Sequence, residues 1–180
     1  MRKIKLETKR LILTEWGTTE EEIKFLKKNL NDKNITKTLF NPPYPYTKED
    51  AIDFLNTRDD AKKGGYYSFK IIRKEDNKII GNISLNAKRN PTTGGAGYYI
   101  EKESWGQGFA TEALAEIIKF AFKKLKLHKV FAHHYKLNPA SGRVMQKCNM
   151  EVEGVLKEHV YKNGIYHDDI YYGIINKKER

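Results

Sequence analysis

The sequence predicts an α/β (α+β) fold: a mixed, mostly antiparallel twisted sheet of about seven strands flanked by four helices. Three observations lead to this prediction. Short stretches in which apolar and polar residues alternate indicate strands, and four stretches with helical apolar spacing indicate helices. Some neighbouring strands are joined by short turns and others by a helix, which is typical of a mixed sheet. The expected order is β-α-α-β-β-β-α-β-α-β-β.

The first half of the chain contains one predicted strand and two predicted helices before the central hairpin. "IKLETKRLILTEW" alternates over about residues 4–13 and indicates the strand. Thr18 or Thr19 is suited to cap the first helix, in "GTTEEEIKFLKKNL". Thr47 with Asp50 three residues later marks the start of the second, which should end at the glycine pair of "AKKGG".

The second half alternates strands with two helices. "YYSFKIIRKEDNKIIGNISLN" predicts two antiparallel strands, and "TTGGAGYYI" a third. A helix follows, and then the strand "HKVFAHHYK". Asn138 at the N-cap and Pro139 at the first helical position predict the last helix, and the chain should close with a long hairpin that turns at Asn163 and Gly164.

Composition limits the class of protein. A chain of 180 residues fits a single domain, expected over 1–180. No apolar run approaches the roughly 20 residues that span a bilayer, and "MRKIKLETKR" lacks the apolar stretch of a signal peptide, so we expect a cytoplasmic protein without a membrane partner. The lone Cys148 excludes an internal disulfide and is expected to be buried at a helix end.

The formal charge of +11 favours anionic partners: a phosphorylated cofactor, RNA or an acidic protein. Charge alone does not choose among them, and the dispersed lysines are typical of a solvated surface. The histidines lack the spacing of a zinc site, and His133 and His134, adjacent on a strand, should point to opposite faces. We therefore expect no metal.

The stretch "SWGQGFATEAL" places two glycines, one residue apart, directly before a strongly patterned helix. Glycine has no side chain to offer, so the backbone itself is the candidate functional group. The N–H groups of residues 106–111 at a helix N-terminus are suited to hold a pyrophosphate. A plain strand-to-helix turn is the alternative, and no Gly-Lys-Ser/Thr follows to indicate a P-loop.

The stretches "LETKRLIL", "GYYIEKESWGQGFATEAL", "NPASGRVMQKCNMEVEGVLKE" and "NGIYHDDIYYGI" are spread over nearly the whole length of the chain, from residue 6 to residue 174. With this element order, the chain resembles the GCN5-related N-acetyltransferase (GNAT) superfamily, and within it the RimJ/RimL branch of ribosomal-protein N-terminal acetyltransferases. The resemblance implies that acetyl-CoA lies in a cleft where two parallel strands splay apart. Many members of this family are homodimers, but nothing in the sequence marks an interface.

The resemblance also implies roles for individual residues. The strand that ends at Tyr98, Tyr99 and Ile100 would pair with the pantetheine arm and donate a hydrogen bond to the thioester carbonyl. The pyrophosphate loop would consist of Gly106, Gln107, Gly108, Phe109, Ala110 and Thr111. Asn138 would bind the pantetheine, and Ser141 would protonate the leaving thiolate; the alternative for Ser141 is a backbone contact in the first helical turn.

The sequence departs from the family pattern where a general base is expected. Gly95 and Val160 stand at positions where members of the branch carry glutamates, and Trp105 replaces the polar first residue of the loop. Glu158 lies two residues before Val160, on the same face if the segment is a strand, and is the substitute base. An ordinary exposed glutamate is the alternative.

An amine that attacks a thioester needs an N–H donor at the carbonyl, a proton for sulfur and a route for its own proton. The amine must be neutral, which is easier for an α-amine, with a pKa near 8, than for lysine, near 10.4. The resemblance to this branch implies that the acceptor is a protein N-terminus, such as that of an acidic ribosomal protein, and nucleic acid is not required.

Two alternatives remain for the function. The first is a small amine, a polyamine or an aminoglycoside, that enters past local carboxylates; these would be Glu15, Glu49, Asp50 and Asp53. The second is a noncatalytic module that keeps the CoA site and binds RNA or protein. The acceptor side of the resembling family would involve Tyr44, Tyr46, Tyr66 and Tyr67, for which ordinary packing is the alternative.

Overall fold

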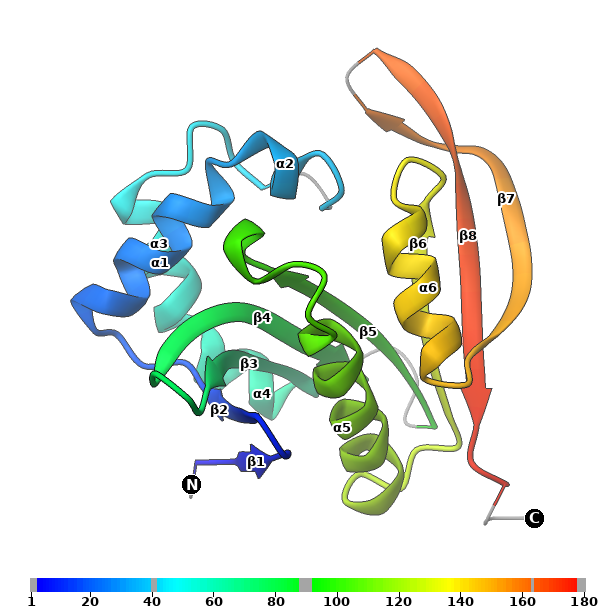
Figure 1. The fold of residues 1–180 in the computed structure, drawn as a ribbon, viewed down its shortest axis with the longest axis horizontal. Helices are drawn as coiled ribbons and strands as arrows, with labels where there is room; N and C mark the ends of the chain where they lie inside the picture. The colour runs from blue at the N-terminus through cyan, green and yellow to red at the C-terminus, as the bar shows by residue number, and fades with distance from the viewer. Residues whose placement is uncertain (1–2, 40–41, 88–91, 163, 178–180) are drawn as a thin grey trace.

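The computed structural model describes residues 3–39, 42–87, 92–162 and 164–177. Eight strands form one sheet in these residues, in the order β1-β2-β3-β4-β5-β6-β8-β7 (Figure 1). The strands are β1 (Lys5–Glu7), β2 (Leu11–Glu15), β3 (Tyr66–Arg73), β4 (Lys78–Asn86), β5 (Thr93–Ile100), β6 (Lys129–Tyr135), β7 (Glu151–Lys162) and β8 (Ile165–Ile175). The helices are α1 (Glu20–Leu30), α2 (Lys33–Thr36), α3 (Lys48–Asn56), α4 (Arg58–Lys63), α5 (Phe109–Lys123) and α6 (Pro139–Lys147), with a 3₁₀ turn, η1 (Lys102–Ser104).

Neighbouring strands are antiparallel except for β5 and β6, which are parallel and connected through α5. Within the described chain these two strands pair only from Thr93 to Gly95 on β5 and from Lys129 to Phe131 on β6. Beyond these residues they diverge, and β6 stays paired with β8 while β5 stays paired with β4. The centre of the sheet therefore has an opening between two strand ends, as the resemblance implied.

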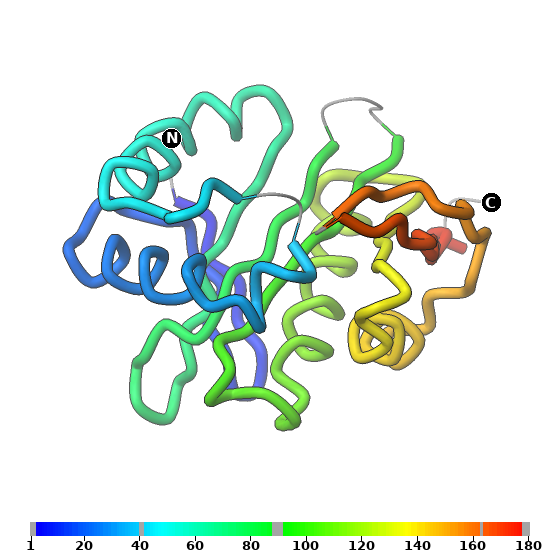
Figure 2. The backbone as a smooth tube through the Cα atoms, turned by 90° about the horizontal axis from the view of Figure 1, so that it is seen from above, coloured from blue at the N-terminus to red at the C-terminus, as the bar shows by residue number. Residues whose placement is uncertain are grey.

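Helices cover the two faces of the sheet unequally. On one face, α5 and α6 pack on a core that includes Phe69, Ile83, Leu114 and Val130. On the other face, α1 and α3 cover the half of the sheet that contains β2, β3 and β4, around a second core. Figure 2 shows α5 and α6 on the side opposite to α3 and α4. Because side chains alternate along β5, Tyr98 packs with the first core and Tyr99 with the second.

Helix starts agree with the sequence predictions. Thr19 caps α1 and Thr47 caps α3, each in a capping box with the residue three positions later. The side chain of Asn138 accepts a hydrogen bond from the N–H of Ser141, and Pro139 is the first residue of α6. Buried Cys148 ends that helix, and Asn149 follows with a φ of 58°.

The fold class is confirmed, but several elements differ in number. The predicted first strand is two strands, β1 and β2, because the chain turns at Thr8, whose N–H donates to the Leu11 carbonyl. The predicted second helix is divided into α3 and α4 at Thr57, and the single turn α2 was not predicted. The described residues thus contain eight strands and six α-helices. No helix among them is long and apolar enough to cross a membrane, and Asn163 of the predicted hairpin turn lies outside them.

A buried carboxylate holds the start of α1 against the sheet. Glu22 is 1% exposed and accepts hydrogen bonds from the N–H groups of Gly17 and Thr19 and from the Thr19 hydroxyl. It also forms an ion pair with Lys70 of β3. Burial on its own would raise the pKa of Glu22, but the hydrogen bonds from Lys70, Gly17 and Thr19 outweigh it, and the pKa lies below its ordinary value.

We predict that Glu22→Gln lowers the free energy of unfolding at pH 7 by about 1–3 kcal/mol, because Lys70 loses its charged partner in a buried setting. Since the pKa of Glu22 is lowered on folding, its contribution is complete above the unfolded-state pKa of roughly 4.3 and is lost as the pH falls through the folded-state value. Urea unfolding at pH 7 and pH 3 should therefore show a smaller gap between variant and wild type at the lower pH. Exposed Glu21 provides the control, since Glu21→Gln should change stability by at most about 0.5 kcal/mol.

Candidate functional site

The opening between β5 and β6 leads into a cavity of about 480 Å³, called the α5 cavity. Its walls are the end of β5, the loop before α5, the first turns of α5 and α6, and α2. The predicted acid Ser141 lines it, and so do most of the predicted cofactor residues: Tyr98, Tyr99, Ile100, Gly106, Gly108, Phe109, Ala110, Thr111 and Asn138. Gln107 belongs to the same loop but does not line the cavity.

The loop before α5 has the backbone geometry that its glycines predicted. Gly106 and Gly108 have φ values of 76° and 81°, in the left-handed region that other residues avoid. Gly108 is the N-cap of α5 and brings no capping side chain, so it satisfies none of the free N–H groups of the first helical turn. These N–H groups, at the positive end of a helix that lines the cavity, favour an anion.

Contacts of the Arg10 side chain, which no sequence pattern predicted, hold this loop in place. The Nε of Arg10 donates to Glu112 at 2.7 Å, its Nη1 donates to the Gln107 carbonyl at 3.0 Å, and its guanidinium lies 4.5 Å from the centre of the Phe109 ring. Glu112 also accepts from the Arg10 N–H and from the Thr8 hydroxyl. Burial alone would raise the pKa of Glu112, but the hydrogen bonds from Thr8 and Arg10 lower it, so the carboxylate is charged at neutral pH.

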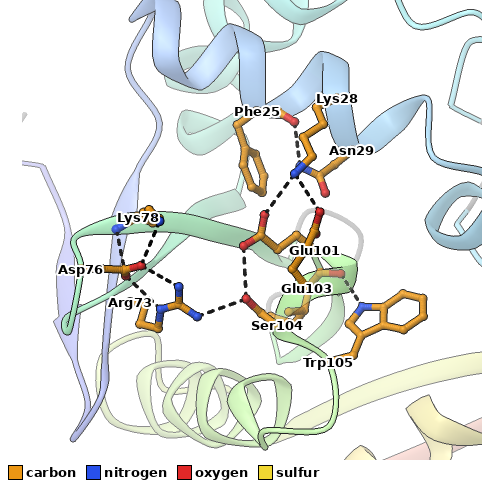
Figure 3. A network of polar contacts seen from close by, with 11 residues as sticks. Phe25, Lys28, Asn29, Arg73, Asp76, Lys78, Glu101, Glu103, Ser104 and Trp105 are labelled. Carbon is orange, nitrogen blue, oxygen red and sulfur yellow. Dashed lines mark hydrogen bonds and ion pairs between the residues drawn. The ribbon is translucent and has the colours of Figure 1, made fainter.

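A second polar network fixes η1, the turn that connects β5 to the loop (Figure 3). The Ser104 hydroxyl donates to Glu101 at 3.2 Å and accepts from Arg73 at 3.4 Å. Lys28 of α1 lies 3.9 Å from Glu101. The indole of Trp105 donates to the carbonyl at the end of β5 at 2.7 Å, so this departure from the family pattern stabilises the strand end. Contacts from α1, β3 and β5 therefore position the start of the loop.

On the opposite wall, Ser141 and Tyr98 span the opening between α6 and β5. Their hydroxyl oxygens are 2.9 Å apart, and the Tyr98 hydroxyl also donates to the Ser141 carbonyl at 3.2 Å. Burial raises the pKa of Tyr98 well above its usual value, so the phenol stays protonated. The side chain of Asn138 accepts from the Ser141 N–H at 3.3 Å and so fixes the start of α6.

A second cavity, of about 460 Å³, lies on the other face of the sheet and is called the α3 cavity. Asp50 and Asp53 of α3 line it together with the aromatic rings of Tyr46 and Tyr66. It shares Tyr98 and Tyr99 with the α5 cavity, so the end of β5 is a common wall of the two. The Tyr99 hydroxyl is buried and has no hydrogen-bond partner among the described residues.

Part of the acidic and aromatic set predicted for the acceptor side lines this cavity, and the rest of the set lies elsewhere. Tyr67 instead packs edge-on against Phe120 on the α5 face. Tyr44 is 65% exposed and does not line the α3 cavity. Glu15 forms an ion pair with Lys62 at 2.6 Å. Ordinary packing thus accounts for part of the tyrosine set, as the alternative predicted.

The alternation argument for Glu158 is wrong. Between the pairs Leu156–Asp169 and Val160–His167, three residues of β7 face a single residue of β8. This bulge breaks the alternation, and Glu158 adopts a φ of 48° within it. The side chain is exposed and lines neither cavity. No pattern in the sequence indicated this bulge.

The two adjacent histidines of β6 point to opposite faces, as predicted. His134 is buried beside Tyr172 on the α5 face, and His133 contacts Asp169 on the other face. Among the residues that the structure describes, no three His, Cys, Asp or Glu side chains are grouped so that they could hold a metal ion.

Comparisons with known proteins agree on one family. The model of the acetyltransferase (GNAT) domain matches residues 10–151. The uncharacterized N-acetyltransferase YnaD of Bacillus subtilis is 29% identical over 96% of this chain and 98% of its own length. The ribosomal-protein-serine acetyltransferase of Escherichia coli is 28% identical over 76% of this chain and 77% of its own. The crystal structure of spermidine N-acetyltransferase from Vibrio cholerae, in complex with CoA and spermine, has a TM-score of 0.82, 23% identity and coverage of 95% of this chain and 98% of that one.

Proposed function

Because this chain belongs to the acetyltransferase (GNAT) family and is an N-acetyltransferase, we propose that it transfers an acetyl group directly from acetyl-CoA to a primary amine. The observation that carries the proposal is that two cavities on opposite faces of the sheet meet at the end of β5. The α5 cavity is suited to acetyl-CoA, the acetyl donor, and the α3 cavity to the amine that accepts the acetyl group. Such an arrangement holds both reactants together, and positioning then supplies much of the acceleration.

The residues of the α5 cavity fit acetyl-CoA, which when bound supplies an activated acetyl group as a thioester. The loop of residues 106–111 offers backbone N–H groups to its phosphates at the α5 N-terminus. The edge of β5 beyond Gly95 is unpaired toward β6 within the described chain, so it can form hydrogen bonds along the extended arm of the ligand. Asn138 lies at the same opening.

Ser141 is the proposed donor of the proton that the leaving sulfur needs. Its hydroxyl lines the α5 cavity beside a phenol that stays protonated. When the Ser141 Oγ gives its proton away, the Tyr98 hydroxyl, 2.9 Å from it, can turn its single proton from the Ser141 carbonyl to that oxygen. The pair therefore holds a proton at the wall of the cavity without a charged group.

The α3 cavity is the proposed entry for the amine, and a protein N-terminal α-amine is the first acceptor class. The relative from Escherichia coli, named for a ribosomal protein, supports this class. An α-amine is also easier to deprotonate at neutral pH than a lysine side chain. The net charge of +11 would attract an acidic target protein.

A polyamine is the second candidate, favoured by the two carboxylates in the α3 cavity. Asp50 and Asp53 lie in this cavity although the chain as a whole is strongly basic. Asp50 also caps α3, where the N–H and hydroxyl of Thr47 lower its pKa and keep it ionised. The structural neighbour that holds CoA and spermine is consistent with this candidate.

We predict that Gly108→Val lowers the affinity for acetyl-CoA at least about a hundredfold, because a β-branched residue is strained at a φ of 81° and displaces the loop. Calorimetric titration measures the effect. Gly164→Val is the matched control, since Gly164 has a φ of 80° with open space around it, away from the cavity. Equal acetyl-CoA affinity in Gly108→Val and wild type would refute the assignment of the loop.

We predict that the wild-type chain releases CoA thiol from acetyl-CoA when it is given an acceptor, in a panel of N-terminal peptides, spermidine and an aminoglycoside. Turnover on peptides supports the first acceptor class. Turnover on spermidine that Asp53→Asn weakens about tenfold in kcat/KM supports the second. Binding of acetyl-CoA without turnover on any amine, together with salt-dependent RNA binding, would indicate a noncatalytic module instead.

We predict that Ser141→Ala lowers kcat by about 10²-fold and changes the affinity for acetyl-CoA little, because the proton for sulfur must then come from water. Ser141→Thr keeps the hydroxyl and should recover part of the rate. Steady-state kinetics at saturating amine, with calorimetry on the same preparations, separate the two effects. An unchanged kcat in Ser141→Ala would leave the serine with only its structural role at the start of α6.

A further inference from the structure

A histidine and a buried carboxylate form a pair on the side of the opening away from Ser141. Asp169 of β8 is 1% exposed, and its carboxylate lies 2.9 Å from the Nδ1 of His133 on β6. A carboxylate so deeply buried is rare without a partner, and His133 is the partner. The acetyl transfer proposed above assigns no role to either residue.

The pair fixes both the orientation and the tautomer of the imidazole. Ionised Asp169 only accepts hydrogen bonds, so the neutral ring carries its proton on Nδ1 and its lone pair on Nε2. The Tyr171 ring stacks on the imidazole with centres 4.9 Å apart and planes 10° apart. The His133 side chain is still 36% exposed. A histidine held by a carboxylate at one nitrogen and accessible to solvent is suited to accept a proton at the other.

His133 lies on β6, beside the opening between β5 and β6. It lies two residues beyond Phe131, the last β6 residue that pairs with β5. Alternation along β6 puts it on the same face as Phe131, and Phe131 faces Gly95 of β5. Alternation along β5 puts Gly95 and Tyr99 on that face too, and Tyr99 lines the α3 cavity. The imidazole is not part of the lining of either cavity, but it lies on the same face of the sheet as the proposed amine entry.

A further contact joins this part of the sheet to the α3 cavity. The ammonium of Lys162, near the tip of the β7–β8 hairpin, donates to the carbonyls of Thr36 and Leu39 and lies 5.9 Å from the centre of the Tyr135 ring. Leu39 lines the α3 cavity, and the Tyr135 ring is 6.5 Å from that of His133. The hairpin tip thereby links the wall that carries His133 to the wall of the cavity.

We propose that His133 is the general base that removes the proton of the attacking amine, and that Asp169 is the residue that positions it. This inference rests on the proposed function. The amine nitrogen forms a bond to the acetyl carbon and gives one proton to the Nε2 of His133, while the carbon–sulfur bond breaks and the sulfur takes a proton from Ser141. The protons that His133 gains and Ser141 loses are then exchanged with water. Base and acid act from opposite faces of the opening between β5 and β6.

The His133–Asp169 pair also offers a base in a chain that has Gly95 where the resembling branch carries a glutamate. The glutamate that branch members carry at the position of Gly95 is absent, but Phe131 lies directly across from Gly95, and His133 is the next residue on that face of β6. A Cβ at Gly95 would come within 2.8 Å of the Phe131 ring, so a larger residue there would require that ring to shift. His133 instead offers a base on the neighbouring strand.

Other charged and titratable groups face this region. Asp169 and Tyr171 come from β8, and Tyr135 from the same strand as His133. Further along this face, Lys129 is paired with Glu153 of β7 at 2.6 Å, and Lys162 lies over Tyr135. Lys129 and Glu153 are paired with each other, and Asp169 is the charged group in direct contact with the His133 ring.

The test compares four variants in the full chain at saturating acetyl-CoA, with the peptide and polyamine panel as acceptors. We expect His133→Gln to lower kcat about 10²-fold or more while the affinity for acetyl-CoA is unchanged. Asp169→Asn should give a smaller loss, at least about tenfold, and shift the acidic limb of the kcat–pH profile. Exposed His128, one residue before β6, provides the matched control, and His128→Gln should keep full activity. Glu158→Gln tests the competing base and should also remain active.

Two kinetic results would overturn the inference. One is an active wild type in which His133→Gln keeps its kcat and pH profile; the other is a large loss of kcat in Glu158→Gln alone. If the wild type acetylates no amine, the proposed function fails as well, which is a different outcome from an active wild type with an active His133→Gln. Nitrogen-15 spectra of labelled histidine in the unmutated protein give a readout independent of turnover and of variant folding. They should show His133 protonated at Nδ1 when neutral, and a neutral ring protonated at Nε2 would contradict the proposal.

Discussion

The parting of β5 and β6 is the constraint on which the rest of this structure depends. Two parallel strands pair at three positions and then separate, each held by an antiparallel neighbour on its outer side. Backbone N–H and C=O groups that lose their strand partner need another one, from water or from a ligand with amide groups of its own. The opening also lets the α5 cavity and the α3 cavity meet at a single strand end, where a donor and an acceptor can approach from opposite faces.

Ion pairs and hydrogen bonds between distant segments hold the walls of this opening. Arg10 and Glu112 tie the turn between β1 and β2 to the loop before α5. Glu22 and Lys70 tie α1 to β3, and the Ser104 network ties the end of β5 to α1 and β3. The Glu22–Lys70 pair is buried, so breaking it would leave an uncompensated charge. The Arg10 and Ser104 contacts keep the backbone N–H groups of the loop in place before a ligand arrives, so that less entropy is lost on binding.

The faces of the sheet separate the groups that would give and accept protons. Strand alternation sends Tyr98 toward Ser141 on the α5 face, and sends His133 toward Asp169 on the other. Burial raises the pKa of Tyr98 and keeps the phenol beside Ser141 protonated, and the Asp169 carboxylate fixes the orientation of the His133 ring. A sheet that splits in its centre can thus present an acid and a base to one reacting group without bringing them into contact.

The sequence by itself determined the local structure and the family. The caps at Thr19, Thr47 and Asn138 and the left-handed glycines of the α5 loop depend on residues within a few positions, so pattern and propensity are sufficient to predict them. Only the tertiary structure decided which distant residues meet: Arg10 with Glu112, Tyr98 with Ser141 and His133 with Asp169. It also placed Glu158 in a bulge, where the alternation of an ideal strand no longer applies. These contacts follow from strand register and from the point where β5 and β6 part, and both are set by the packing of the whole sheet rather than by neighbours along the chain.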